Sequence, residues 1–432
     1  MRALALALAA LAAGCGSSSP TGAVDAGRDG PAAQLDAQLP ADGPAATDAA
    51  ATDGTANDAG GDAGAACPRS PAAADRTRYV VVSHPYSASG QANTFQVLTL
   101  SQAGTLATTA TTFEMGRAGR GEIAFTPDGV VGIAVQDDGT LGAFTIDAAG
   151  AVTVKHAAYD DGVLYAERVV MDPSGAFVWV LDDQWRTNGG GIYRVRINCD
   201  GTLTSEGLYT AAKLAGQMLL LPGGPARAVV AAYDVLESSA PNDTHLIDLT
   251  DPPTLVGSAD GFPAVGGAEE AFLASAALTS DGKYALVGDN SEFSGIPNRV
   301  AVIEVTTTSL IARQVLSPVP DPVSLVASPF GGPVLAIDGY GNAIHKLTYD
   351  PSNASAPFTI AGEIAYSGAK PQLPDAAVLI RRGALEGRVL IAENVGVHQV
   401  AFHGDGTVTD LGMTPAGGTG NGAIVGAIGV QP

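Results

Sequence analysis

The chain has 432 residues, of which 46% are hydrophobic, and it contains 55 glycines and 27 prolines. So many turn-forming residues in an apolar background indicate short strands joined by turns and argue against long helices. Lysine and arginine number 22 against 44 aspartates and glutamates, so the formal net charge of −22 argues against nucleic acid as a partner.

The first fifteen residues have the order of an export signal. Arg2 precedes an apolar run from Ala3 to Ala13, which is too short to span a bilayer as a mature helix, and Gly14 and Cys15 follow. The residues from Leu11 to Cys15 resemble the bacterial lipobox, which implies that Cys15 is lipidated. No aspartate follows Cys15, so we expect an outer membrane lipoprotein on the periplasmic or cell-surface side. An ordinary secretory peptide that happens to contain a cysteine is the alternative.

A polar segment separates this signal from the rest of the chain. From Gly16 to Ala66 the sequence consists mainly of Ala, Asp, Gly, Pro, Ser and Thr, with eight aspartates, one arginine and no aromatic residue. Such a composition cannot bury enough apolar surface to fold. We expect a disordered tether whose ends lie on the order of 40 Å apart, followed by one folded domain from Cys67 to Pro432.

Two cysteines remain if Cys15 is lipidated, namely Cys67 and Cys199. In an exported, oxidising setting a disulfide between them is the economical hypothesis. The roughly ten residues after Cys67 can span about 33 Å, which is enough to reach across one face of a domain. Two free buried thiols are the alternative.

The stretch from Glu122 to Val154 is the clearest unit of a repeat. Two apolar runs enclose the turn Pro127-Asp128-Gly129 and two further runs follow, which predicts four short strands joined by tight turns. Related units recur about every fifty residues, a spacing typical of propellers or solenoids. Seven first strands are predicted, each an apolar run leading into a turn: Glu122 to Gly129, Arg168 to Gly175, Gln217 to Gly224, Ser275 to Gly282, Ser324 to Gly332, Ala376 to Gly383, and Gly422 to Pro432.

The two ends of the folded domain complement each other. Arg78 to Val82 has the pattern of a second strand with no first strand before it, and Gly422 to Val430 has that of a first strand with nothing after it. Pairing them removes the open edge that an isolated sheet would expose. The sequence therefore predicts an all-β fold, a seven-bladed β-propeller in which the C-terminal strand completes the first blade.

The residues from Glu167 to Leu203 resemble a blade of the lactonase-like, or YVTN, seven-bladed propellers, and Gly121 to Val152 is similar. This family includes cycloisomerase-like and 6-phosphogluconolactonase-like enzymes, alongside surface proteins with no known reaction. In its enzymatic members a Pro-Arg-His sequence commonly opens a first strand. The equivalent positions here are Arg120-Gly121-Glu122 and Ala166-Glu167-Arg168, which contain no histidine.

The first strands should all begin on one face of the propeller, around its axis. We expect their polar residues to form an inner ring that could orient a small polar ligand or a hydrated cation, and the alternative is that these residues simply line a wet channel. The ring consists of Glu122, Glu167, Arg168, Gln217, Ser275, Ser324, Asp375 and Asn421.

The second strands should end on the same face in an outer, mostly acidic ring. Such residues commonly accept backbone N–H bonds from the turn that follows: His84, Asp137, Asp182, Asp234, Asp289, Asp338 and Glu393. Three histidines begin third strands, His245, His345 and His398. Even in neighbouring blades they would lie about 15 Å apart, given about 4.8 Å per strand. Zinc needs its ligands within about 2 Å, so no metal site is predicted.

Two functions agree with these observations, and neither requires a cofactor, because no nucleotide-binding, haem or nucleophile-elbow motif occurs. The first is a membrane-anchored, monomeric propeller that binds an unknown protein or small molecule at its funnel face. The second is a lactonase-like hydrolase of a small sugar lactone. In that enzyme Glu122 or Asp375 would act as the general base and Arg168 would polarise the carbonyl.

Overall fold

The computed structural model describes Cys67 and residues 69–87, 89–160, 165–182, 190–209, 212, 215–232, 243–263, 273–290, 295–417 and 424–432. The predicted signal, Cys15 and the predicted tether lie outside these residues. All described residues belong to one compact unit, Asp62–Pro432. Within the described part, no helix is long and apolar enough to cross a membrane.

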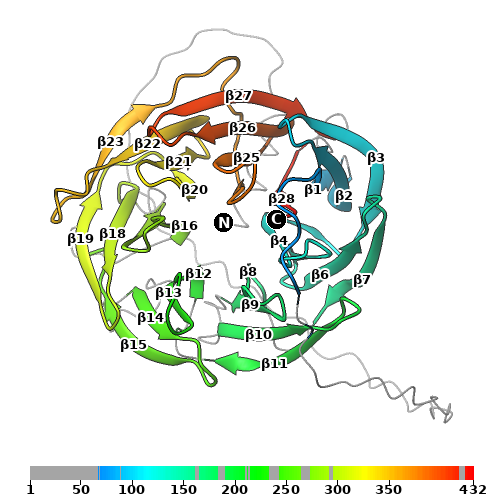
Figure 1. Cartoon of the computed structure of the whole chain (residues 1–432), viewed down its shortest axis with the longest axis horizontal. Coiled ribbons are helices and arrows are strands. Elements are labelled where there is room, and N and C mark those ends of the chain that lie inside the picture. The colour runs from blue at the N-terminus through cyan, green and yellow to red at the C-terminus, as the bar shows by residue number, and fades with distance from the viewer. Residues whose placement is uncertain are drawn as a thin grey trace, which may run out of the picture. The chain divides into compact units, whose positions relative to one another are not determined.

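The described residues form an all-β, propeller-like arrangement of sheets around a common centre (Figure 1). Five of the sheets have four antiparallel strands each. In chain order their strands are β8 (Arg168–Met171), β9 (Phe177–Asp182), β10 (Gly191–Ile197), β11 (Leu203–Tyr209); β12 (Ala215–Leu220), β13 (Arg227–Ala232), β14 (Thr244–Asp248), β15 (Thr254–Ala259); β16 (Leu273–Leu278), β17 (Tyr284–Asp289), β18 (Arg299–Val305), β19 (Leu310–Leu316); β20 (Pro322–Ala327), β21 (Val334–Asp338), β22 (Ala343–Tyr349), β23 (Phe358–Glu363); β24 (Ala377–Leu379), β25 (Arg388–Glu393), β26 (Gly396–Phe402) and β27 (Val408–Pro415).

The sixth sheet has eight strands in the order β3-β2-β1-β28-β4-β5-β6-β7. Its strands come from both ends of the described chain: β1 (Arg78–Ser87), β2 (Gly90–Leu100), β3 (Leu106–Glu114), β4 (Ala118–Phe125), β5 (Val131–Gln136), β6 (Leu141–Ile146), β7 (Val152–Tyr159) and β28 (Ala427–Val430).

The last strand joins the two halves of this sheet. β28 pairs antiparallel with β1, with Val80 opposite Val430 and Val82 opposite Ile428, so the predicted pairing of the two ends is confirmed. β28 also pairs with β4 in parallel, with Ala427 opposite Gly121. Seven blades were predicted, whereas the described strands form five four-stranded sheets and one eight-stranded sheet. The reason is that β28 offers a hydrogen-bonding edge to each of its neighbours.

Burial changes systematically from the inner to the outer strand of each sheet. Every residue of β5, β17 and β21 is buried, because these second strands are covered on both faces by neighbouring sheets. The outer strands β7 and β19 are mostly exposed or half-buried. The core therefore consists of apolar layers between successive sheets. In one of them Leu286 and Val302 pack with Leu325 and Ala336.

The face that carries the turns after the first strands is called the turn face below, and the opposite face, where the first strands begin, is called the mouth face. The turn after β4 shows why glycine is needed there. The N–H of Gly129 donates to the carbonyl of Thr126 at 2.7 Å, and Gly129 has a φ of 72°. That left-handed conformation strains residues with a Cβ atom.

An N-terminal strap, Cys67 with residues 69–77, crosses the turn face and leads into β1 (dark blue in Figure 1). Cys67 forms a disulfide with Cys199, so the predicted bond is confirmed. Further along the strap, Arg69 forms an ion pair with Asp128 at 3.1 Å, and the N–H of Ala384 donates to Asp75 at 2.8 Å. The strap thus ties together parts of three sheets that are distant in sequence.

Candidate functional site

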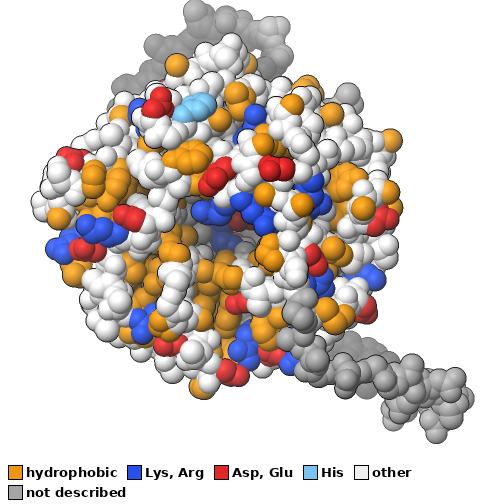
Figure 2. Space-filling model, viewed as in Figure 1, with side chains coloured by type: hydrophobic (Ala, Val, Ile, Leu, Met, Phe, Trp, Pro, Cys, Tyr) orange, Lys and Arg blue, Asp and Glu red, His pale blue; other side chains and the backbone are white. Residues whose placement is uncertain are grey.

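The centre of the ring of sheets is hollowed in the space-filling view, and basic and acidic side chains gather around the hollow (Figure 2). One member of the predicted inner ring, Asp375, forms an ion pair at the mouth face. Arg120, in β4, places its Nε 2.6 Å from a carboxylate oxygen of Asp375, which directly precedes β24. The side chains of Arg120 and Asp375 are 44% and 24% exposed, and the Asp375 oxygen that pairs with Arg120 is itself buried. The carboxylate of Asp375 raises the pKa of the Arg120 guanidinium.

Two tyrosines interact electrostatically with Arg120 and raise the pKa of its guanidinium. Tyr86 is the last residue but one of β1, and Tyr340 lies in the turn between β21 and β22 with 47% of its surface exposed. Burial of its hydroxyl raises the pKa of Tyr340, and the carboxylates of Asp321 and Asp375 add to this rise. The mouth thus combines a cation, a carboxylate and two phenols, which is a set that can hydrogen-bond a polar ligand and pack against it.

A second charged group lies along β4, two residues after Arg120. Glu122 is open to the channel but surrounded by protein atoms, and this loss of hydration raises the pKa of its carboxyl. The guanidinium groups of Arg168 and Arg381 oppose the rise, because they favour the ionised carboxylate. Burial lowers the pKa of Arg381, and Glu122 opposes that change. Glu122 and Arg168, two residues of the expected inner ring, thus interact electrostatically.

Asp375 has a different partner from the one expected. It was expected in one ring with Glu122 and Arg168, but its ion pair is with Arg120. Arg120 and Arg381 were both absent from the predicted set. A signal for Arg120 exists in the sequence, since it opens the same first strand as Glu122. Arg381 lies in the turn after β24, and only the packing of distant strands brings it near Glu122.

The remaining predicted ring residues contribute less to the channel. Gln217, Ser275 and Ser324 are 4%, 3% and 8% exposed, and the hydroxyl of Ser275 donates to the carbonyl of Pro322 at 2.5 Å. We therefore leave these three out of the candidate site. Glu167 is half-buried beside Arg168, and Asn421 lies outside the described residues.

The outer acidic ring is largely occupied with protein contacts. Asp182, Asp338 and Glu393 accept backbone N–H bonds from Tyr165, Gly341 and Gln372 at 3.1, 2.7 and 3.1 Å. Asp289 forms a buried ion pair with Arg299 at 2.7 Å. His84 is buried against Gln96, and Asp137 is half-buried. Asp234 lies outside the described residues.

The three histidines of the third strands have separate partners. His245 contacts the hydroxyl of Ser258 at 2.9 Å, and His345 lies 3.7 Å from Asp338. His398 is fully buried between Asp410, at 2.6 Å, and Glu393, at 3.6 Å. Over the described ranges, no group of three His, Cys, Asp or Glu side chains is placed to hold a metal ion.

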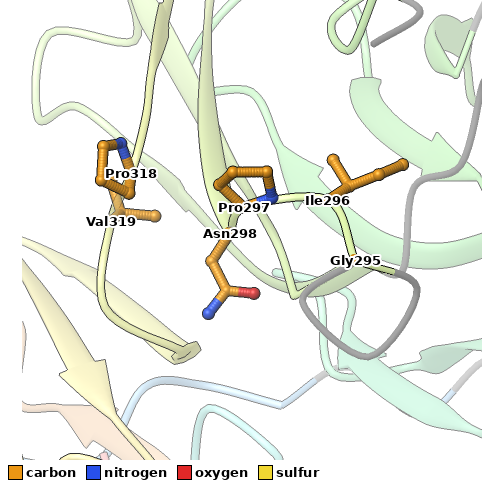
Figure 3. A pocket seen from close by; sticks show the side chains of 6 residues that line it. All are labelled: Gly295, Ile296, Pro297, Asn298, Pro318 and Val319. Carbon is orange, nitrogen blue, oxygen red and sulfur yellow. The ribbon is translucent and has the colours of Figure 1, made fainter. Parts of the chain in front are cut away.

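A pocket of about 370 Å³ lies beside the loop that precedes β18 (Figure 3). Pro318 and Val319 face Pro297 and Asn298 across it, and the N–H of Val319 donates to the carbonyl of Asn298 at 3.0 Å. Its lining contains one side-chain amide and no charged group. This pocket therefore lacks the acid–base groups that the inner channel has.

Neither protein-family models nor curated proteins match this sequence. Solved structures do match. A candidate 6-phosphogluconolactonase from Bacteroides fragilis is 12% identical, with a TM-score of 0.59 over 84% of this chain and 99% of the other. The periplasmic gluconolactonase PpgL of Pseudomonas aeruginosa is 13% identical, with a TM-score of 0.55 over 82% and 99%.

A third similar structure is Chaetomium thermophilum Sqt1 bound to the N-terminus of the ribosomal protein L10. It is 14% identical, with a TM-score of 0.51 over 78% of this chain and 88% of the other. At such identities the likeness shows the fold alone, which is a β-propeller of the kind found in lactonase-like proteins.

Proposed function

We propose that this protein is an exported, membrane-anchored β-propeller whose mouth binds a small polar molecule or a partner segment. The observation that carries the proposal is the Arg120–Asp375 pair, partly exposed at the mouth and flanked by Tyr86 and Tyr340. A solved propeller with a bound protein terminus, Sqt1, is consistent with a binding role for this fold.

The proposal includes seven blades. The eight-stranded sheet divides naturally between β28 and β4, because those two strands are joined by only two residue pairs. On this division β28, β1, β2 and β3 form one blade and β4 to β7 the next, which together with the five four-stranded sheets makes seven. The antiparallel pairing of β28 with β1 supports closure by the C-terminal strand.

The location of the protein is part of the proposal. The lipobox-like residues from Leu11 to Cys15 support lipidation of Cys15 and attachment to the outer membrane. Metabolic labelling with a radioactive fatty acid tests this. Label should enter the full chain and be lost in Cys15→Ser. Label in the variant, or a soluble wild-type protein, would exclude the anchor.

Hydrolysis of a small sugar lactone is the second candidate, because Glu122 has a raised pKa and faces Arg168. Glu122 would accept a proton from water while the water oxygen bonds to the lactone carbonyl carbon. Arg168 would stabilise the negative charge on the carbonyl oxygen. The ring C–O bond would then break, and the departing oxygen would take the proton from Glu122. The gluconolactonase named among the similar structures supports this candidate.

One experiment separates the two candidates. The full chain is screened by thermal shift against sugar lactones, the corresponding sugar acids and divalent cations, and lactone turnover is measured in parallel. A thermal shift without turnover supports binding alone, whereas turnover that disappears in Glu122→Gln supports the hydrolase. If no compound shifts the melting temperature and no lactone is hydrolysed, the proposed small-molecule site is excluded.

A further inference from the structure

Three arginines lie together on the turn face, outside the proposed mouth site. Arg76 lies in the strap and Arg78 begins β1, while Arg382 lies in the turn after β24. These three residues are called the arginine cluster below, and Arg381, the neighbour of Arg382, interacts with Glu122 instead. The strap brings its two halves together, because the guanidinium of Arg78 donates to the carbonyl of Arg382 at 2.8 Å.

Arg78 anchors the cluster. It is only 1% exposed, and besides Arg382 it donates to the carbonyls of Gln431, at 3.1 Å, and Ala74, at 2.9 Å. Its hydrogen-bond acceptors are main-chain carbonyls, so its positive charge is buried without a carboxylate bonded to it. A buried charge of this kind is costly unless another charge compensates it.

Arg76 and Arg382 lie against the same turn, Pro127–Gly129. Arg382 donates to the carbonyl of Pro127 at 3.4 Å, and an Nη atom of Arg76 is 2.6 Å from the position that a Cβ on Gly129 would take. The hydrogen bond from Arg76 to Pro432 is also long, at 3.5 Å. Both guanidinium groups are half-buried, so they remain reachable from solvent and hold only weak hydrogen bonds.

Positive charge exceeds negative charge around the cluster. Arg69 and the three cluster arginines share the carboxylates of Asp75 and Asp128 and the terminal group of Pro432, and Asp128 is already paired with Arg69. Burial lowers the pKa of Arg76 and of Arg78, and repulsion from Arg382 lowers both further. The buried Nε atoms of Arg76 and Arg78 have no acceptor among the described residues. The cluster thus has positive charge and donors to spare in a protein that is acidic overall.

We propose that the arginine cluster is a binding site for an oxyanion of the phosphate or sulfate type, with Arg76 and Arg382 as its direct ligands. Guanidinium groups bind such anions through paired, charge-assisted hydrogen bonds. The bound anion would relieve the repulsion within the cluster, and buried Arg78 would add attraction from behind. The anion is either a free solute or the phosphate of a lipid headgroup, to which the strap side of the domain would be turned.

The proposal is tested on the full chain with inorganic phosphate, titrated against chloride at constant ionic strength and followed by calorimetry and by the melting temperature. Saturable binding with one site is expected. Arg76→Gln and Arg382→Gln should each weaken it by about tenfold or more. Arg313→Gln is the matched control, because it removes an arginine that pairs with Glu304 on an outer strand. Its affinity for phosphate should equal that of the wild type.

A second measurement separates anion binding from a purely structural role. If Arg382 only supports the turn, Arg382→Gln should have a lower melting temperature than the wild type in chloride. If it is an anion ligand, the variant should melt at or above the wild-type temperature in chloride and lose the increase that phosphate produces. The same proteins are also tested for binding to vesicles that contain phosphatidic acid. The site is supported if the wild type binds phosphate or the vesicles saturably and Arg382→Gln does not. The proposal would be overturned if the wild type and both cluster variants bound phosphate and vesicles equally well, or if the wild type bound neither ligand.

Discussion

The Nε atom of Arg120 lies 2.6 Å from a carboxylate oxygen of Asp375, and this contact joins β4 to the segment that leads into β24. The two residues come from sheets that are distant in sequence, so the contact depends on the circular arrangement of the sheets. Because both side chains are partly exposed, water screens their attraction and the pair adds little to stability. Arg120, the more exposed member of the pair, can therefore contact a ligand.

Replacing either member should therefore affect binding far more than folding. Arg120→Ala and Asp375→Asn are each expected to change the free energy of unfolding by less than about 1 kcal/mol. The affinity for any ligand found at the mouth should fall about tenfold, because a charge-assisted hydrogen bond is lost. Urea unfolding and calorimetry measure the two effects. Unchanged affinity in both variants would place the ligand elsewhere.

Removing the disulfide between Cys67 and Cys199 should destabilise the domain, because the bond restricts the unfolded chain over a separation of 132 residues. Cys199→Ser is expected to lower the free energy of unfolding by about 3 to 5 kcal/mol under oxidising conditions. Guanidinium unfolding measures the change. Cys67→Ser should have the same effect, and a reductant should remove the difference between wild type and variants. A wild type that does not respond to reductant would contradict a stabilising bond.

The buried His398 makes stability depend on pH. Burial of the imidazole opposes its charge, but the nearby carboxylate of Glu393 and the hydrogen bond with Asp410 outweigh burial, so the pKa of His398 lies above its ordinary value. Its stabilisation is complete below the unfolded pKa of about 6.5 and is lost as pH rises through the higher folded pKa. Burial raises the pKa of Asp410, but hydrogen bonds from Ser367 and His398 lower it further than burial raises it. Asp410 therefore changes the pH dependence of stability only at acidic pH.

The test compares unfolding free energies of wild type and His398→Gln from about pH 6 to about pH 8. The advantage of the wild type should shrink as pH rises, at a rate that approaches 1.4 kcal/mol per pH unit at most. A difference that does not vary over this range would mean that His398 is neutral in the folded state.

Gly383 shows how closely the strap approaches the turn after β24. Its φ is 80°, and a Cβ atom there would lie 2.7 Å from the carbonyl oxygen of Ala74. Gly383→Ala is expected to cost about 2 to 4 kcal/mol, from backbone strain and displacement of the strap. Gly406 is the control, since it has a φ of 81° with open space around it. Gly406→Ala should cost only about 1 kcal/mol, and thermal unfolding compares the two. Equal losses would mean that the strap is not held against this turn.

Local patterns predicted the first strands well. The run that begins at Arg168 became β8 (Arg168–Met171), and the run that begins at Ser324 became most of β20 (Pro322–Ala327), because an apolar run that ends in a turn marks a strand locally. The pairing of the chain ends and the bond between Cys67 and Cys199 were also predictable. In each case the two segments or cysteines have no possible partner nearby in the sequence, so few pairings had to be considered.

The alternation of apolar runs and turns thus determined by itself that the chain is all-β and propeller-like, because period-two burial and turn chemistry are local properties of a strand. The tertiary structure alone decided which polar side chains stay open. The hydroxyl of Ser275 donates a hydrogen bond to the carbonyl of Pro322, and Arg120 forms an ion pair with Asp375. The guanidinium of Arg78 donates to the carbonyl of Arg382. Such contacts depend on angles and distances between sheets far apart in sequence, and no short stretch of residues encodes them.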